Sequence, residues 1–63
     1  MAYILYFVRA DSAVLDLTIL TAGDDAEAER LALGRLAEQP AYRSVEVCDE
    51  DRLVCRRDRA DLF

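Results

Sequence analysis

The sequence contains no histidine, no lysine and no tryptophan, and only two of its 63 residues are cysteine. Without lysine there is no Schiff-base amine and no P-loop lysine to hold a phosphate. Without histidine, the two cysteines, Cys48 and Cys55, do not complete the closely spaced ligand set of a zinc or iron–sulfur site. Their spacing also differs from the C-x-x-C pattern of a redox pair. We therefore expect two free thiols, no metal and no cofactor.

Groups for acid–base catalysis are equally scarce. Ser12 and Ser44 have no histidine or lysine to activate them as nucleophiles. The acidic stretch at residues 49–51 resembles a calcium-binding loop only in part, because the glycine and the distal glutamate of an EF-hand are missing. A domain of 63 residues also offers little room for a cleft between two carboxylates. The sequence therefore predicts a protein that is not an enzyme.

Long apolar runs and basic clusters are missing too. No segment approaches the roughly 20 apolar residues that a membrane-spanning helix needs. The N-terminal stretch carries no positive charges ahead of its short apolar run, unlike a secretory signal peptide. The net charge of −5, from 13 acidic residues against 8 arginines, disfavours nucleic-acid binding, which requires a basic surface. These features predict a cytoplasmic protein that binds neither membranes nor nucleic acid.

Two strands are predicted in the first third of the chain. Residues 2–9 are rich in aromatic and β-branched side chains and are apolar on both alternating sets, as expected of a central strand covered on both faces. Residues 14–20 alternate, with Leu15, Leu17 and Ile19 on one face, which is typical of a half-buried strand. A polar break between the two runs favours a turn, so together they predict a hairpin.

A helix is predicted between Gly23 and Pro40. Asp24 is a suitable N-cap, and Glu27 three residues later completes a pattern similar to a capping box. Pro40 ends the helix, since proline does not continue the backbone hydrogen-bond pattern. Four apolar residues at helical spacing predict the buried side of the helix: Ala28, Leu31, Ala32 and Leu36.

The last third of the chain predicts a second hairpin. Val45 and Val47 alternate with other residues, the acidic residues 49–51 form the turn, and a short apolar run returns. The element order is therefore β-β-α-β-β. We expect an α+β fold in which four antiparallel strands form one sheet, the first strand lies inside it, and the helix packs on one face. This ββαββ domain is predicted to span residues 1–57, followed by a charged C-terminal tail at residues 58–63.

One helix covers only one face of such a sheet, so the other face is predicted to be a contact surface. A domain of this size usually needs support from a disulfide, a metal or a second subunit, and the first two are not expected here. An apolar face left exposed marks an interface, and we predict a homodimer formed through the open face or an edge strand. If the helix packs on the even-numbered set of the first strand, the predicted interface residues are Tyr3, Leu5, Phe7, Cys48 and Val54.

The C-terminal tail suggests an alternative function. Its last three residues, Asp61, Leu62 and Phe63, are similar to the end of the pentapeptide with which bacterial proteins dock into the sliding clamp. Arg59 and Ala60 stand where that motif prefers glutamine and leucine, so the match covers only the motif's final three positions. Two apolar anchors on a flexible tail suit a docking peptide for another protein. Otherwise the tail is expected to fold back and cover the open face of a monomer.

A second alternative is an acidic inhibitor that occupies the basic groove of a nucleic-acid-binding protein. Long-range attraction between an acidic surface and a basic partner favours such a complex. The carboxylates that form this surface are Asp24, Asp25, Glu27, Glu29, Asp49, Glu50 and Asp51.

Three stretches of the chain resemble a known family. The patterns Y-x-L-Y-F, A-G-D-D-A-E-A and V-E-V-x-D-x-D-R-L-V are similar to those of small bacterial proteins of unknown function, which carry a VEVWDGDRLV-like second hairpin. The chain departs from that pattern at Cys48, where tryptophan is usual, and at Glu50, where glycine is usual. The resemblance implies a ββαββ fold and no particular activity.

Overall fold

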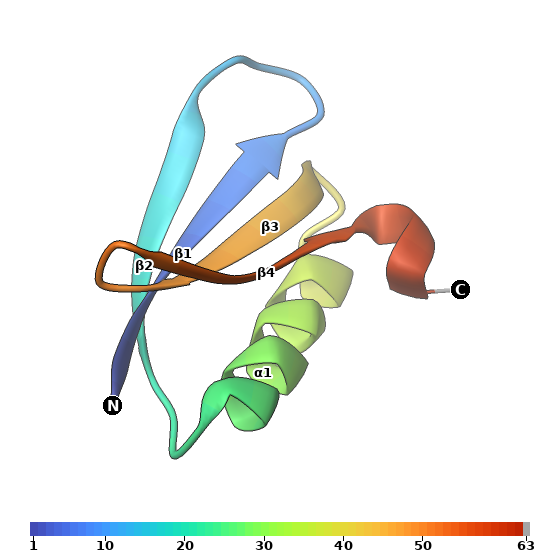
Figure 1. Ribbon diagram of the computed structural model, residues 1–63. Coiled ribbons are helices and arrows are strands. Elements are labelled where there is room, and N and C mark those ends of the chain that lie inside the picture. Colours follow the sequence, from blue (N-terminus) through green and yellow to red (C-terminus); the bar gives the residue numbers. More distant parts are fainter. Residues whose placement is uncertain (63) are drawn as a thin grey trace.

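The computed structural model describes residues 1–62 and combines a four-stranded sheet with one α-helix and a short 3-10 helix (Figure 1). The strands are antiparallel and lie in the order β2-β1-β3-β4. The predicted α+β fold and ββαββ order are confirmed, and β1 lies inside the sheet as expected. The elements are β1 (Ala2–Arg9), β2 (Leu15–Thr21), α1 (Asp25–Glu38), β3 (Tyr42–Asp49), β4 (Arg52–Asp58) and η1 (Arg59–Leu62).

Helix α1 begins where its capping residues place it. The Asp24 side chain accepts a hydrogen bond from the Glu27 backbone N–H (2.8 Å), and the Glu27 carboxylate accepts one from the Gly23 N–H (2.7 Å). These bonds satisfy backbone donors at a helix start, where partners inside the helix are missing. The helix ends at Glu38, just ahead of Pro40, so both predicted boundaries are confirmed.

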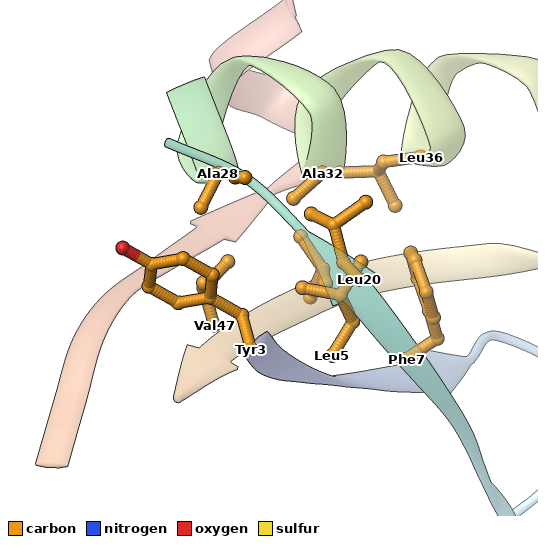
Figure 2. Packing of buried hydrophobic residues seen from close by; sticks show 10 residues of the cluster. Tyr3, Leu5, Phe7, Leu20, Ala28, Ala32, Leu36 and Val47 are labelled. Carbon is orange, nitrogen blue, oxygen red and sulfur yellow. The ribbon is translucent and has the colours of Figure 1, made fainter. Parts of the chain in front are cut away.

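The core lies between α1 and the face of the sheet that carries Tyr3, Leu5 and Phe7 (Figure 2). Helix α1 packs mainly against β3, with smaller contacts to β1 and β4. Two of its three buried residues are alanines, which allow the helix to lie close to the bulky side chains of β1. The buried cluster consists of Tyr3, Leu5, Phe7, Leu20, Ala22, Ala28, Ala32, Leu36, Val45 and Val47.

Two tyrosines tie the edges of this core to carboxylates. The Tyr3 hydroxyl donates a hydrogen bond to Asp25 at the start of α1 (2.8 Å). The Tyr42 hydroxyl donates one to Asp16 of β2 (2.6 Å), and the Tyr42 ring stacks on Phe7 with ring centroids 4.6 Å apart. Each ring therefore contributes apolar contact, while its polar end finds a partner at the margin of the core.

The hairpin of β3 and β4 contains a β-bulge. Val54 has no partner on β3, because Cys48 pairs with Leu53 while Val47 pairs with Cys55. The extra residue changes the alternation of side chains along β4. Leu53 therefore shares the face of Cys48, and Cys55 lies on the helix side with Val47.

The described part of the C-terminal tail is packed against the domain. Arg59 donates hydrogen bonds to the backbone carbonyls of Leu36 (2.6 Å), Gln39 (2.6 Å) and Tyr42 (2.8 Å). The last carbonyls of a helix have no partners within it, so this guanidinium both caps α1 and fixes η1 in place. Leu62 is half-buried and packs against the core cluster.

Candidate functional site

The sheet face that α1 leaves uncovered is largely apolar, and we call it the open face. Ile4 pairs with Ile19 and Tyr6 with Leu17, so the apolar sets of β1 and β2 share this face. Paired residues on this face form three rows that run across the sheet from β2 to β4, and the middle row is charged on β3 and β4. From β2 to β4 the three rows are Ile19, Ile4, Cys48, Leu53; then Leu17, Tyr6, Glu46, Arg56; then Leu15, Val8, Ser44, Asp58.

Large apolar side chains on both outer strands of this face are exposed. The exposed fractions are 53% for Leu15, 58% for Leu17, 63% for Ile19 and 57% for Leu53. The β1 residues between them are half-buried. Single exposed apolar residues are common, but a contiguous group of them is typical of an interaction surface. The open face is therefore the candidate functional site.

Three of the predicted interface residues are wrong, because the helix packs on them. Tyr3 and Leu5 are fully buried beneath α1, and Phe7 is only 2% exposed. Cys48 does lie on the open face, where it is half-buried. Val54 is half-buried at the bulge and packs against the core cluster.

The residues that sequence analysis did not assign to the interface are those of β2. Leu15, Leu17 and Ile19 alternate as in a half-buried strand, yet their side is the open face. Asp16 and Thr18 face the helix side instead, and Asp16 accepts the hydrogen bond from Tyr42 there. The alternation within β2 identifies two faces but does not say which of them the helix covers.

The charged end of the open face carries one acid and one base in the same row. Glu46 of β3 lies opposite Arg56 of β4. Within residues 1–62 Glu46 makes no salt bridge, and Arg56 approaches only Asp58, at 4.0 Å. An exposed ion pair at that distance contributes little. Both charges are therefore available to a binding partner.

The two cysteines are free thiols on opposite faces of the sheet. Burial raises the pKa of both thiols, and nearby carboxylates raise it further, Glu46 at Cys48 and Glu29 at Cys55. A raised pKa leaves little thiolate at neutral pH, so neither thiol has the character of a reactive nucleophile. Across residues 1–62, no three His, Cys, Asp or Glu side chains are placed to hold a metal ion together.

The two acidic clusters of the sequence meet around Arg52. Its guanidinium binds Asp25 at the start of α1 (3.1 Å) and Asp49 at the end of β3 (3.0 Å). The hydrogen bonds from Arg52 and Tyr3 lower the pKa of Asp25. Burial, together with the bond to Asp25, raises the pKa of Tyr3 to about 12. These carboxylates join the helix to the β3–β4 hairpin.

The other carboxylates named for an inhibitor are also partly engaged. Glu29 accepts a hydrogen bond from an arginine of β4 (2.7 Å), and Asp24 and Glu27 cap α1. Glu50 and Asp51, in the β3–β4 turn, make no salt bridge within residues 1–62. Few of these acids are free for a basic partner, and the inhibitor hypothesis gains no support from their arrangement.

The ion pair between Asp25 and Arg52 predicts a dependence of stability on pH. Because folding lowers the pKa of Asp25, its contribution is complete above the usual aspartate pKa and is lost as the pH falls through the lowered value. Replacing Asp25 with asparagine is expected to reduce stability modestly at neutral pH, since the pair is half exposed, and to matter less in acid.

Urea unfolding from neutral pH down to about pH 3 measures this effect. Asp51→Asn is the matched control, because Asp51 has no salt bridge among the described residues and should leave the acid limb of the curve unchanged. A gap between Asp25→Asn and the unmodified protein that stays constant with pH would contradict the assignment.

The residues named for tail docking lie partly within the fold. Asp61 accepts a hydrogen bond from the Asp58 backbone N–H (2.8 Å), and Leu62 packs against the core. Phe63 lies outside the described residues. A docking partner would have to detach Leu62 from the core before it could bind, so tail docking stays a prediction.

Comparison with known proteins does not assign this chain to a family. No protein-family model, curated protein or solved structure matches the chain. The resemblance to the small bacterial ββαββ proteins therefore stays a prediction. Among the described residues, no helix has the length and apolar character needed to cross a membrane.

Proposed function

We propose that the chain is a small, non-enzymatic interaction domain that forms a homodimer through its open face. The observation that carries this proposal is the contiguous group of exposed apolar side chains, Leu15, Leu17 and Ile19, beside Ile4 and Tyr6. Removing apolar surface from water is favourable by roughly 25 cal/mol for each Å². A small domain with its core on one face of the sheet gains substantial support from such burial.

The low net charge of the open face allows a second copy to be the partner. A two-fold contact brings one residue against a second residue of the other copy, and the reverse pair forms by symmetry. Apolar residues of one copy can meet those of the other in this way, while the charged residues Glu46, Arg56 and Asp58 lie together on the β3–β4 side of the face. With two acids and one base, each open face has a net charge of only −1, so two such faces repel each other much less than the net charge of −5 on each chain suggests.

Solution mass across micromolar protein concentrations, by light scattering after gel filtration with reductant present, tests the proposal. The unmodified protein is expected to have the mass of a dimer. Leu17→Glu and Ile19→Glu are each expected to give a folded monomer, because they place an uncompensated carboxylate in the centre of the contact. Circular dichroism checks that both variants keep the fold.

Val14→Glu is the matched control. Val14 is 62% exposed, comparable with Ile19, but it lies in the loop before β2 and outside the rows of the open face. It should leave the dimer intact. A monomer at every concentration would refute the proposal, and a dimer that persists in Leu17→Glu and Ile19→Glu would move the interface to another surface.

A further inference from the structure

The outer edge of strand β2 lacks the features that usually protect the edge of a sheet. β2 is an outermost strand, and α1 packs mainly against β3 and leaves it uncovered (Figure 1). Residues 15–21 contain no proline, lysine or arginine, and β2 pairs with β1 without a bulge. A regular, largely apolar edge strand of this length is prone to pair with another strand.

The opposite edge of the sheet, strand β4, is protected. It carries Arg52, Arg56 and Arg57, and the bulge at Val54 interrupts its pairing with β3. The 3-10 helix η1 follows β4 directly and packs against it. Charged side chains, bulges and covering segments are the usual means by which edge strands avoid association. The contrast between the two edges identifies β2 as the one that is open to a further strand.

The hydrogen bonds between β1 and β2 show which backbone groups of β2 face outward. Met1 and Ala22 exchange two backbone hydrogen bonds, of 2.9 and 3.0 Å. Such pairs alternate with non-bonded pairs along an antiparallel ladder, so the even-numbered residues of β2 direct their N–H and C=O groups toward β1. The groups that point away from the sheet therefore belong to Leu15, Leu17, Ile19 and Thr21.

These outward groups select a register for pairing with a second copy. In a two-fold antiparallel pair, outward groups must lie opposite outward groups, so odd-numbered residues face odd-numbered residues. Complete overlap of Leu15–Thr21 with the same strand of a second copy meets this condition and places Thr18 on the two-fold axis. Leu17 then lies opposite Ile19 of the second copy, and apolar cross-strand pairs of this kind stabilise a sheet.

The charge of β2 also suits a second copy. Its one charged residue, Asp16, falls opposite Leu20 in this register, so two carboxylates do not face each other. The Asp16 carboxylate is already held on the helix side by the Tyr42 hydroxyl. On the open face, Leu17 and Ile19 of both copies come together, and the apolar rows of the two copies join into one continuous strip.

We propose that the β2 edge is a second self-association site, where two copies pair antiparallel about Thr18 and join their four-stranded sheets into one. The edge pair does not require the open-face dimer. Its axis is perpendicular to the sheet, whereas the axis of an open-face dimer is parallel to it, as a closed tetramer requires. The tetramer, unlike the edge pair, rests on the proposed function. The edge contact is expected to be the weaker one, because its backbone groups bond to water when they are free.

Disulfide trapping tests the pairing and its register, in protein that carries Cys48→Ala and Cys55→Ala. Copper–phenanthroline should oxidise Thr18→Cys to a cross-linked pair, because the two copies of residue 18 face each other with Cα atoms about 4.5 Å apart, which suits a disulfide. Thr21→Cys is the matched control. Its two copies lie roughly 20 Å apart along the strands in this register and should not cross-link.

Solution mass near millimolar concentration separates this contact from the open-face dimer. The unmodified protein is expected to pass from dimer to tetramer in that range. Thr18→Lys should remain a folded dimer, because it places two ammonium groups opposite each other on the helix side, away from the open face. Asp51→Asn changes the net charge by the same amount in the β3–β4 turn and should still form the tetramer.

Two results would overturn the proposal. The first is cross-linking of Thr18→Cys that is no faster than that of Thr21→Cys. The second is a tetramer that persists in Thr18→Lys, or a dimer of the unmodified protein that does not associate further at millimolar concentration. A monomeric protein that still cross-links through Thr18→Cys would refute the open-face dimer and support the edge pair, so the two proposals fail separately.

Discussion

Replacing Leu5 with alanine is expected to lower the free energy of unfolding by about 2–5 kcal/mol, whereas the same change at Leu17 should cost roughly 0.5 kcal/mol or less in the monomer. Both are leucines on adjacent strands, and they differ in the face they occupy. Leu5 is fully buried under α1, while Leu17 is 58% exposed on the open face. Truncating Leu5 removes apolar contact and leaves a cavity, but truncating Leu17 leaves only a shorter exposed side chain.

Urea unfolding followed by circular dichroism at low protein concentration measures both changes. At higher concentration the cost of Leu17→Ala should grow, because a dimer stabilises the folded state by mass action and this variant weakens the dimer. The loss of stability in Leu5→Ala comes from the core and not from the dimer, so it should be large at every concentration. An equal loss of stability in the two variants in dilute solution would mean that the helix does not cover the sheet face that contains Leu5.

The element order and the helix boundaries were predictable because they depend on neighbouring residues. Asp24 and Glu27 cap α1 through contacts that reach only a few positions along the chain. Pro40 stops the helix for an equally local reason. The alternating pattern of β2 and the acidic turn before β4 also mark their elements without reference to the rest of the chain. Local chemistry therefore determines the ββαββ order.

The choice of the buried face of β1 depends on packing between distant elements, and sequence analysis chose wrongly. Both alternating sets of β1 are apolar, so its hydrophobic pattern does not discriminate between them. Two of the three buried helix residues, Ala28 and Ala32, are small, and small residues pack best against large ones. Tyr3 and Phe7 are the large residues of the buried set, and Tyr3 also reaches Asp25. Side-chain volume was thus the signal that hydrophobic periodicity missed.

Two features of the second hairpin had no reliable signal in the sequence. The bulge at Val54 changes which β4 side chains share the face of Cys48, and a strict count of alternating positions does not reveal it. Glu50 adopts the left-handed conformation, with φ of 57°, where the resembling family has glycine. A glycine at that position would have indicated the left-handed conformation, but glutamate carries no such preference.

Replacing Arg59 with alanine is expected to lower the free energy of unfolding by about 2–3 kcal/mol, because one side chain satisfies three backbone carbonyls. The partners lie 17, 20 and 23 positions away in the chain, which explains why the charged tail gave no sign of this role. Loss of the anchor should also release Leu62 from the core. A shift of this size corresponds to a fall in Tm of roughly 10–20 °C for a domain of this length.

Thermal unfolding of Arg59→Ala, Arg59→Lys and Arg43→Ala separates two contributions to stability. One comes from the hydrogen bonds of Arg59 to the three carbonyls, and the other comes from its positive charge alone. Lysine keeps the charge but lacks the planar fork that reaches several carbonyls, so Arg59→Lys should recover only part of the lost stability. Arg43→Ala removes an exposed arginine that makes no salt bridge among residues 1–62, and it should change Tm little. Faster hydrogen exchange at the C-terminal turn of α1 should accompany the loss in Arg59→Ala, because Arg59 joins that turn to the start of β3. Full stability in Arg59→Ala, with unchanged exchange at that turn, would show that the tail does not hold the helix and is free for a partner to take up.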